Sequence, residues 1–168
     1  KLLIDSTGAV NFQTVGLRQL AARSTGASSD ISLTNTCAGE IEISSLGMID
    51  GVTAAADGNI TLVGGGPIRV SQEIATSGTG SVVIDTENVA GNIVDNVGMG
   101  QAAITVGPAG SISLTTASGE IRGTNPGDAF NIDTGAPSGS LVATVIADAT
   151  TGINIANAGT GDISATLN

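Results

Sequence analysis

Four charged side chains in the last third of the chain could carry out acid–base chemistry. Glu120, Asp128 and Asp133 lie near Arg122 in the sequence. Two carboxylates on either side of a sugar linkage can act as general acid and general base, which is the chemistry of glycoside hydrolysis. One functional hypothesis is therefore a carbohydrate-active enzyme.

The composition argues against this hypothesis. The chain has no Trp, Tyr or His, so no indole or phenol can stack on a sugar ring, and histidine-dependent catalysis or metal binding is excluded. Cys37 is the only cysteine, which excludes an internal disulfide and a cysteine metal cluster, and we expect it to be packed and inert. We therefore predict a non-catalytic protein with no catalytic, cofactor or metal site.

Calcium is the alternative to a chain without a cofactor. The segment 159–162 (Gly-Thr-Gly-Asp) matches part of a glycine-rich calcium-binding nonapeptide, although the full motif is absent. Asp5 and Asp85 occupy what the sequence indicates is one repeat position. Turns that use Asp and Asn side chains explain most of these residues without a metal.

A short phrase recurs along the chain and must position these side chains. It alternates apolar and polar residues, and its copies cover 1–5, 30–34, 59–63, 81–85, 111–115, 140–144 and 162–166. A second form, Gly-polar-Ile, begins at Gly39, Gly66, Gly91 and Gly119, with a looser match at Gly8. Repeats spaced by 22 to 30 residues are typical of a solenoid.

Alternation within each copy assigns its side chains to two faces. Ile31 and Leu33 share one face, as do Ile112 and Leu114 in a later copy. Strands this short cannot bury that face alone, so each must stack on the next copy. The sequence thus predicts an all-β, right-handed parallel β-solenoid over 1–168, a single domain of six to seven coils of 22–30 residues.

Other local patterns lead to narrower expectations. Glycines precede five copies, and we interpret them as turn positions with positive φ: Gly58, Gly80, Gly110, Gly139 and Gly161. Segment 17–23 contains helix formers, whereas the repeat register predicts a strand or loop there. Segments 45–57, 95–101 and 124–128 are predicted to be insertions that emerge on one side and carry any binding specificity.

Outward-facing hydroxyl residues form two predicted columns. The first holds Thr34, Thr115, Thr144 and Thr166, and the second holds Ser32, Thr61, Ser113 and Ser164. Such columns could bind ice or a crystalline polysaccharide, but Thr and Ser also simply suit exposed strand positions. Asn59 lies in an N-glycosylation sequon, at a turn where Asn is common in any case.

The Gly-x-Ile-x-Leu-Thr phrases resemble those of filamentous-haemagglutinin-like adhesins and related repeat-rich bacterial exoproteins. The resemblance covers nearly the whole chain and rests on composition and repeat pattern. It implies a long β-helical shaft that is secreted to the cell surface and used for adhesion or scaffolding. Nothing in this sequence resembles the amino-terminal secretion domain of such proteins, so the chain would be part of the shaft or a filament subunit.

Charge and hydropathy restrict the partners. The 15 acidic residues outnumber 5 basic ones, and the arginines are scattered, so we expect no nucleic-acid binding. No apolar run is long enough for a membrane helix, and we expect no membrane insertion. The predicted function is an extracellular structural or adhesive rod that self-associates end to end or continues in the same chain, with a host or abiotic surface as a further partner. The alternatives are a self-assembling extracellular filament or surface-layer subunit and a carbohydrate-active β-helix enzyme.

Overall fold

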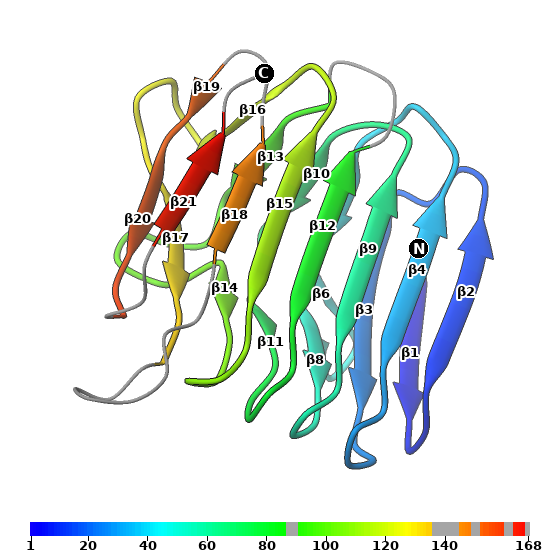
Figure 1. Cartoon of the computed structure of the whole chain (residues 1–168). Coiled ribbons are helices and arrows are strands. Elements are labelled where there is room, and N and C mark those ends of the chain that lie inside the picture. Colours follow the sequence, from blue (N-terminus) through cyan, green and yellow to red (C-terminus); the bar gives the residue numbers. More distant parts are fainter. Residues whose placement is uncertain (87–90, 136–144, 149–151, 160–162, 167–168) are drawn as a thin grey trace.

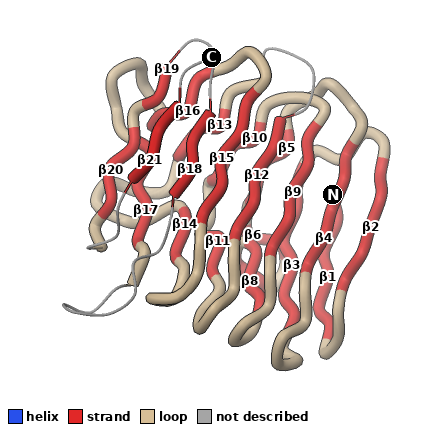
Figure 2. The backbone as a smooth tube through the Cα atoms, viewed as in Figure 1, coloured by secondary structure: helices blue, strands red, loops and turns tan. Residues whose placement is uncertain are grey.

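The chain winds into a right-handed β-solenoid (Figure 1). The computed structural model describes residues 1–86, 91–135, 145–148, 152–159 and 163–166. Within these ranges every regular element is a strand, and Figure 2 shows strands joined by loops without a helix. Parallel pairing follows because each strand meets its counterpart one coil later.

Seven described strands form the front sheet, which is parallel throughout. In spatial order they are β2 (Val10–Thr14), β4 (Ile31–Asn35), β9 (Ile60–Gly64), β12 (Val82–Thr86), β15 (Ile112–Thr116), β18 (Val145–Asp148) and β21 (Ile163–Thr166). Their register runs without a slip from Val10 to Ile163. This sheet is therefore the continuous side of the solenoid.

The back sheet begins with two strands that each cross the whole back of a coil, β1 (Leu2–Ser6) and β3 (Gln19–Ser24). Both ends of β3 then pair with separate strands, so that the sheet continues as two rows. The upper row is β5 (Ile41–Ile43), β10 (Ile68–Val70), β13 (Ile93–Asp95), β16 (Glu120–Gly123) and β19 (Gly152–Ile153). The lower row is β8 (Val52–Ala54), β11 (Ile74–Ala75), β14 (Ile104–Thr105), β17 (Phe130–Asp133) and β20 (Ile155–Asn157).

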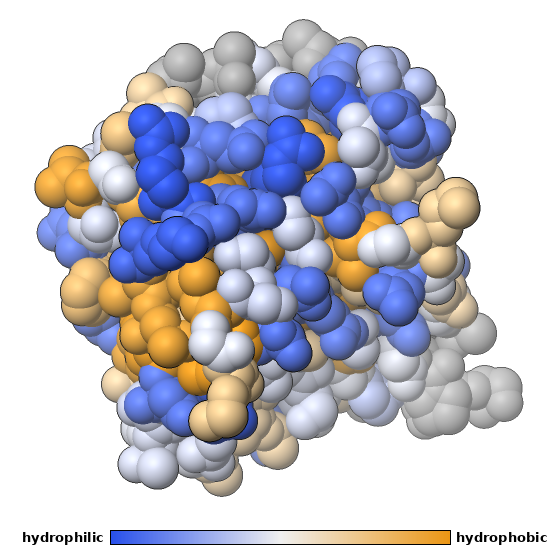
Figure 3. All heavy atoms as spheres, turned by 180° about the vertical axis from the view of Figure 1, so that it is seen from behind, coloured by the Kyte–Doolittle hydropathy of each residue, from blue (hydrophilic) through white to orange (hydrophobic). Residues whose placement is uncertain are grey.

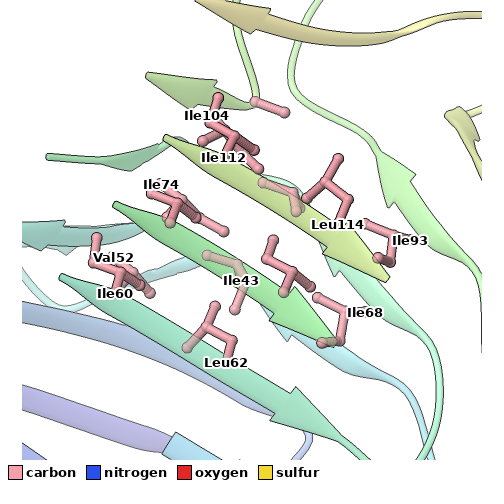
Figure 4. Close-up of a cluster of buried hydrophobic side chains, with 14 of the residues drawn as sticks. Ile43, Val52, Ile60, Leu62, Ile68, Ile74, Ile93, Ile104, Ile112 and Leu114 are labelled. Carbon is pink, nitrogen blue, oxygen red and sulfur yellow. The ribbon is translucent and has the colours of Figure 1, made fainter. Parts of the chain in front are cut away.

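A narrow aliphatic core lies between the front and back sheets. Ile60 and Leu62 from the front meet Ile43 and Ile68 from the back, all at most 1% exposed (Figure 4). Phe130 is the only aromatic residue in this core among the described residues. Small aliphatic side chains suffice because the two sheets are the only layers to be joined.

The predicted faces are confirmed, but one repeat copy was assigned to the wrong sheet. Copy 1–5 forms β1 of the back sheet, and the first front strand is β2, which begins at Val10 in the looser match after Gly8. Alternation shows which residues face inward but not which sheet a strand joins. Copy 140–144 lies outside the described residues, and the strand that pairs with β15 begins at Val145.

The number of front strands is unchanged by these reassignments, because β2 and β18 take the predicted places. The front sheet has seven described strands, and the solenoid makes about five turns, slightly fewer than the six to seven coils that were expected. Strand β1 belongs to the back of the first coil and does not start a coil of its own. Segment 17–23 contributes to strand β3, as the repeat register predicts, and not to a helix.

The role predicted for the glycines before the front strands is wrong. Gly58, Gly80 and Gly110 do not have positive φ. They are needed because successive turns lie in close contact: a Cβ on Gly110 would clash with the carbonyl oxygen of Gly80, and one on Gly80 with that of Gly58. Gly139 and Gly161 lie outside the described residues.

Candidate functional site

Among the described residues, the insertions emerge at one place in the coil, between the upper and lower rows of the back sheet. We call this place the loop corner, and it comprises 44–51, 71–73, 96–103, 124–129 and Asn154. The prediction that insertions share one side is confirmed. The predicted insertion 45–57 is too long, because its second half contains strand β8 and the next turn.

A cleft of about 450 Å³ opens between loops 96–103 and 124–129. Asp95, Gly123 and Asn131 lie at the strand ends beneath it. Its walls come from both loops and include Asn96, Val97, Met99, Thr124, Asn125 and Asp128. Clefts of this size are typical of ligand sites, and this one is formed by loops that the repeat does not require.

The buried carboxylate of Asp95 ties the two coils together beneath the cleft. Its side chain accepts hydrogen bonds from the Val97 amide (2.9 Å) and from Asn131, through the backbone N (3.0 Å) and Nδ2 (2.8 Å). Asp95 is only 3% exposed. A buried carboxylate requires such donors, and these hold both sides of the cleft in fixed positions.

The cleft walls are joined by further hydrogen bonds. The Thr124 hydroxyl lies 2.9 Å from the Asp95 carbonyl oxygen and 3.0 Å from Asn96 Oδ1. Asp128 Oδ2 accepts from Asn125 through the backbone N (3.2 Å) and Nδ2 (2.8 Å). The loops are thus cross-braced, while the Met99 side chain at the tip of loop 96–103 is fully exposed.

The structure separates the charged residues of the enzyme hypothesis. Glu120 forms an ion pair with Arg122 (2.6 Å), beside a smaller hollow of about 160 Å³ on the far side of loop 124–129. Asp128 lines the main cleft, and Asp133 lines another hollow of about 420 Å³ that includes Glu73. No one hollow holds two of the three predicted carboxylates.

The calcium hypothesis loses one of its two sequence arguments, the shared repeat position of Asp5 and Asp85. Asp5 lies in the back sheet and pairs with Arg23 (2.7 Å), whereas Asp85 lies in the front sheet, so the two do not share a repeat position. Segment 160–162 lies outside the described residues. Among the described residues, no three Asp, Glu or Cys side chains come together as a metal site.

The predicted hydroxyl columns are interrupted. Val83 separates Thr61 from Ser113 in one column. In the other column, Val63 and Asp85 lie between Thr34 and Thr115. Ser164 and Thr166 occupy the expected register positions, with Ile146 and Asp148 before them, and Thr144 lies outside the described residues.

Two other predicted positions lie at turns. Asn59 is exposed, and its side chain joins neighbouring coils: Nδ2 donates to Asp30 Oδ1 (3.0 Å) and Oδ1 accepts from the Ser81 amide (3.0 Å). Cys37 is half-buried at the turn that follows β4.

Carboxylates also join neighbouring coils elsewhere. The Asp5 side chain accepts from Arg23, which lowers the pKa of that carboxyl. Hydrogen bonds from Gln19 and Ser71 lower the pKa of Glu42. The backbone N–H and hydroxyl of Thr79 lower the pKa of Asp57. In each case the hydrogen bonds stabilise the ionised form of the carboxylate in the folded chain.

An apolar area covers the back of the first coils. Antiparallel strands β6 (Ser45–Leu46) and β7 (Ile49–Asp50) form a hairpin that lies against β3. There Ala21 and Ile49 are buried, while Leu3 and Met48 are 50% and 96% exposed. Figure 3 shows hydrophobic residues gathered on this side of the back, toward the N-terminal coils.

Sequence reasoning missed Asn96, Met99 and Asn131 as cleft residues. The loop lengths indicated where the cleft lies, but Asn131 is in strand β17, and only the coil geometry brings it beside Asp95.

Comparisons with known proteins give no match for this chain. A scan against protein-family models finds no match, and searches of curated proteins and of solved structures find none either. Within the described residues, no helix is long and apolar enough to span a membrane.

Proposed function

We propose that the chain is a section of a stiff, non-catalytic rod on a bacterial surface, with its adhesive contacts at the loop corner. The observation that carries the proposal is the unbroken register of the front sheet from β2 to β21. Every coil bonds to its neighbours through parallel backbone ladders and packs on one aliphatic core. Solenoids of this kind resist bending and local unfolding because no coil can open without losing contacts on both sides.

The extracellular location is part of the same proposal and rests on the sequence resemblance to haemagglutinin-like exoproteins. The composition is compatible with it, because the chain has few charged residues (12%) and many Ser, Thr and Asn residues. Antibody raised against the chain should label intact producing cells. Labelling only after lysis would contradict an external rod.

The rod itself is tested by limited proteolysis with proteinase K. We expect cleavage to be confined to loops 96–103 and 124–129, with the segment from β4 to β12 surviving as an intact fragment. Early cleavage within β9 or β12 would contradict a continuous rod.

A filament or surface-layer subunit is the second candidate, favoured by the first coil. Leu2 and Ile4 of β1 are only partly buried, and Phe12 of β2 is 43% exposed. One more coil of the same kind would cover these side chains and pair with the free edges of β1 and β2. Electron microscopy of the concentrated chain separates the alternatives: end-to-end fibres support a subunit, and single short rods support a section of a longer chain.

A further inference from the structure

The cleft between loops 96–103 and 124–129 offers hydrogen-bond acceptors but few donors. Each lining asparagine donates its side-chain amide to an acceptor within the protein: Asn96 to Ser71, Asn125 to Asp128, and Asn131 to Asp95. Among the described contacts, Asn125 Oδ1 and Asp128 Oδ1 accept no hydrogen bond, and both residues are exposed. A ligand that brings its own hydrogen-bond donors can therefore bind these two oxygens.

The electrostatics of the cleft favour a cation. Two carboxylates and no basic side chain are among its lining residues. The nearby guanidinium of Arg122 is occupied on the other side of loop 124–129, where it donates to Glu120 and to the carbonyl oxygens of Gly123 and Thr124. Nine of the 15 acidic residues follow residue 69, while four of the five basic residues lie within 1–69. The half of the chain that carries the cleft thus attracts cations over a longer range as well.

The side chains of the cleft walls also indicate which class of hydrogen-bond-donating ligand fits. Met99 is fully exposed, and Val97 is partly buried against the core, so one wall is apolar. A sugar would need an aromatic platform, but Phe130 is fully buried and Phe12 lies in the first coil. An apolar stem with a cationic head suits this combination of an apolar wall and carboxylate oxygens.

We propose that the cleft binds a lysine- or arginine-bearing segment of a partner polypeptide. The cationic head lies on Asp128 Oδ1 and Asn125 Oδ1, and the alkyl stem lies along Met99 and Val97. A cleft of about 450 Å³ accommodates a short peptide segment. This partner deepens the proposed adhesive function, but the cleft requires neither export nor polymerisation, so each proposal can fail alone.

The test uses fluorescein-labelled octalysine and the complete 168-residue chain, with binding followed by fluorescence anisotropy at low salt. We expect Asp128→Asn to weaken binding about tenfold, the equivalent of about 1.4 kcal/mol. Met99→Ser should weaken it about threefold by shortening the apolar wall. Asp30→Asn is the matched control, because it removes one exposed turn carboxylate far from the cleft, and it should change affinity less than about twofold.

Three results would overturn the proposal. The first is equal loss of affinity in Asp128→Asn and Asp30→Asn, which would mean that octalysine responds only to net charge. The second is equal binding of fully acetylated octalysine, which lacks the cationic heads. The third is an absence of binding to the unmodified chain.

Amide NMR provides a readout that does not depend on a variant folding. Adding octalysine to the unmodified ¹⁵N-labelled chain should shift the amide signals of Gly98, Gly100 and Thr124 most. Shifts centred on the front sheet or on the first coils would overturn the assignment to this cleft.

Discussion

The front sheet and the loop corner belong to the same coils, but the length of the chain segments is fixed in the first and variable in the second. Five of the front strands have five residues each, and their register never slips, whereas the connections at the loop corner range from a single residue to eight. The front strands between β2 and β21 are limited by core packing on one face and by backbone pairing on both edges. The connections at the loop corner project away from the coil before returning to it. Neither core packing nor strand register therefore limits their length. The solenoid therefore separates the part that fixes the fold from the part that can acquire a binding function.

An insertion should reveal this difference most strongly. Four Gly/Ser residues placed between Val83 and Ile84 in β12 would break the front register, and we expect a loss of more than about 4 kcal/mol or no cooperative unfolding. The same four residues between Met99 and Gly100 should cost less than about 1 kcal/mol, because loop closure depends weakly on length. Urea unfolding followed by circular dichroism measures both. Equal costs would contradict the contrast between the two regions.

Single substitutions can compare the two faces of one front strand. Ile84 is fully buried, and Ile84→Ala should lower the free energy of unfolding by about 2–5 kcal/mol. Val83 faces outward in the same strand, and Val83→Ala should cost about 0.5 kcal/mol or less. A similar cost for both variants in urea titrations would mean that the outer face also packs against something.

Glycine variants test the close contact of successive turns. Gly110→Ala places a methyl group against the Gly80 carbonyl oxygen and should cost about 1–3 kcal/mol. Gly8 is the control, because a Cβ there meets no atom within 4 Å and its φ is not positive. The melting temperature of Gly8→Ala should stay near that of the unmodified chain. A smaller loss for Gly110→Ala than for Gly8→Ala would contradict the packing argument.

Acid should weaken the back and the turns before the front sheet. Asp5, Glu42 and Asp57 all have lowered pKa values in the folded chain. Their stabilisation is therefore fully present above the unfolded pKa, near 4, and is lost as the pH falls through the lower folded values. This effect is the smallest of the four, because Asp5 and Asp57 are exposed and Glu42 is only half-buried.

Hydrogen exchange between pH 5 and pH 3 measures the acid effect region by region. Amides of β3 and β5 should lose protection before those of β9 and β12. Glu42→Gln should remove part of this pH dependence. Uniform loss across both sheets would show that the carboxylates do not act locally.

Sequence and structure agree where periodicity constrains the chain. The inward pairs Ile31 with Leu33 and Ile112 with Leu114 are buried as predicted, because a strict alternation leaves only one apolar face. The second form is also confirmed, since Ile41, Ile68, Ile93 and Ile121 lie side by side in the upper row.

The differences arise where alternation alone does not determine a position. Segment 1–5 alternates like a front strand, yet it pairs with β3 of the back sheet, a choice that depends on the length of the next turn. The contact between Asp95 and Asn131 could not be predicted, because it depends on how far one coil rises above another. The cleft thus follows from the solenoid geometry and not from any local motif.

Several carboxylates accept hydrogen bonds from residues that come later in the chain. Asp5, Asp30, Glu40, Asp57, Glu73 and Asp95 each accept from a donor one coil later. Glu42 also accepts from an earlier coil, through Gln19. A finished coil therefore presents acceptors to the chain that has not yet folded. Growth from the N-terminus can proceed vectorially, each coil serving as the template for the next as the polypeptide is synthesised.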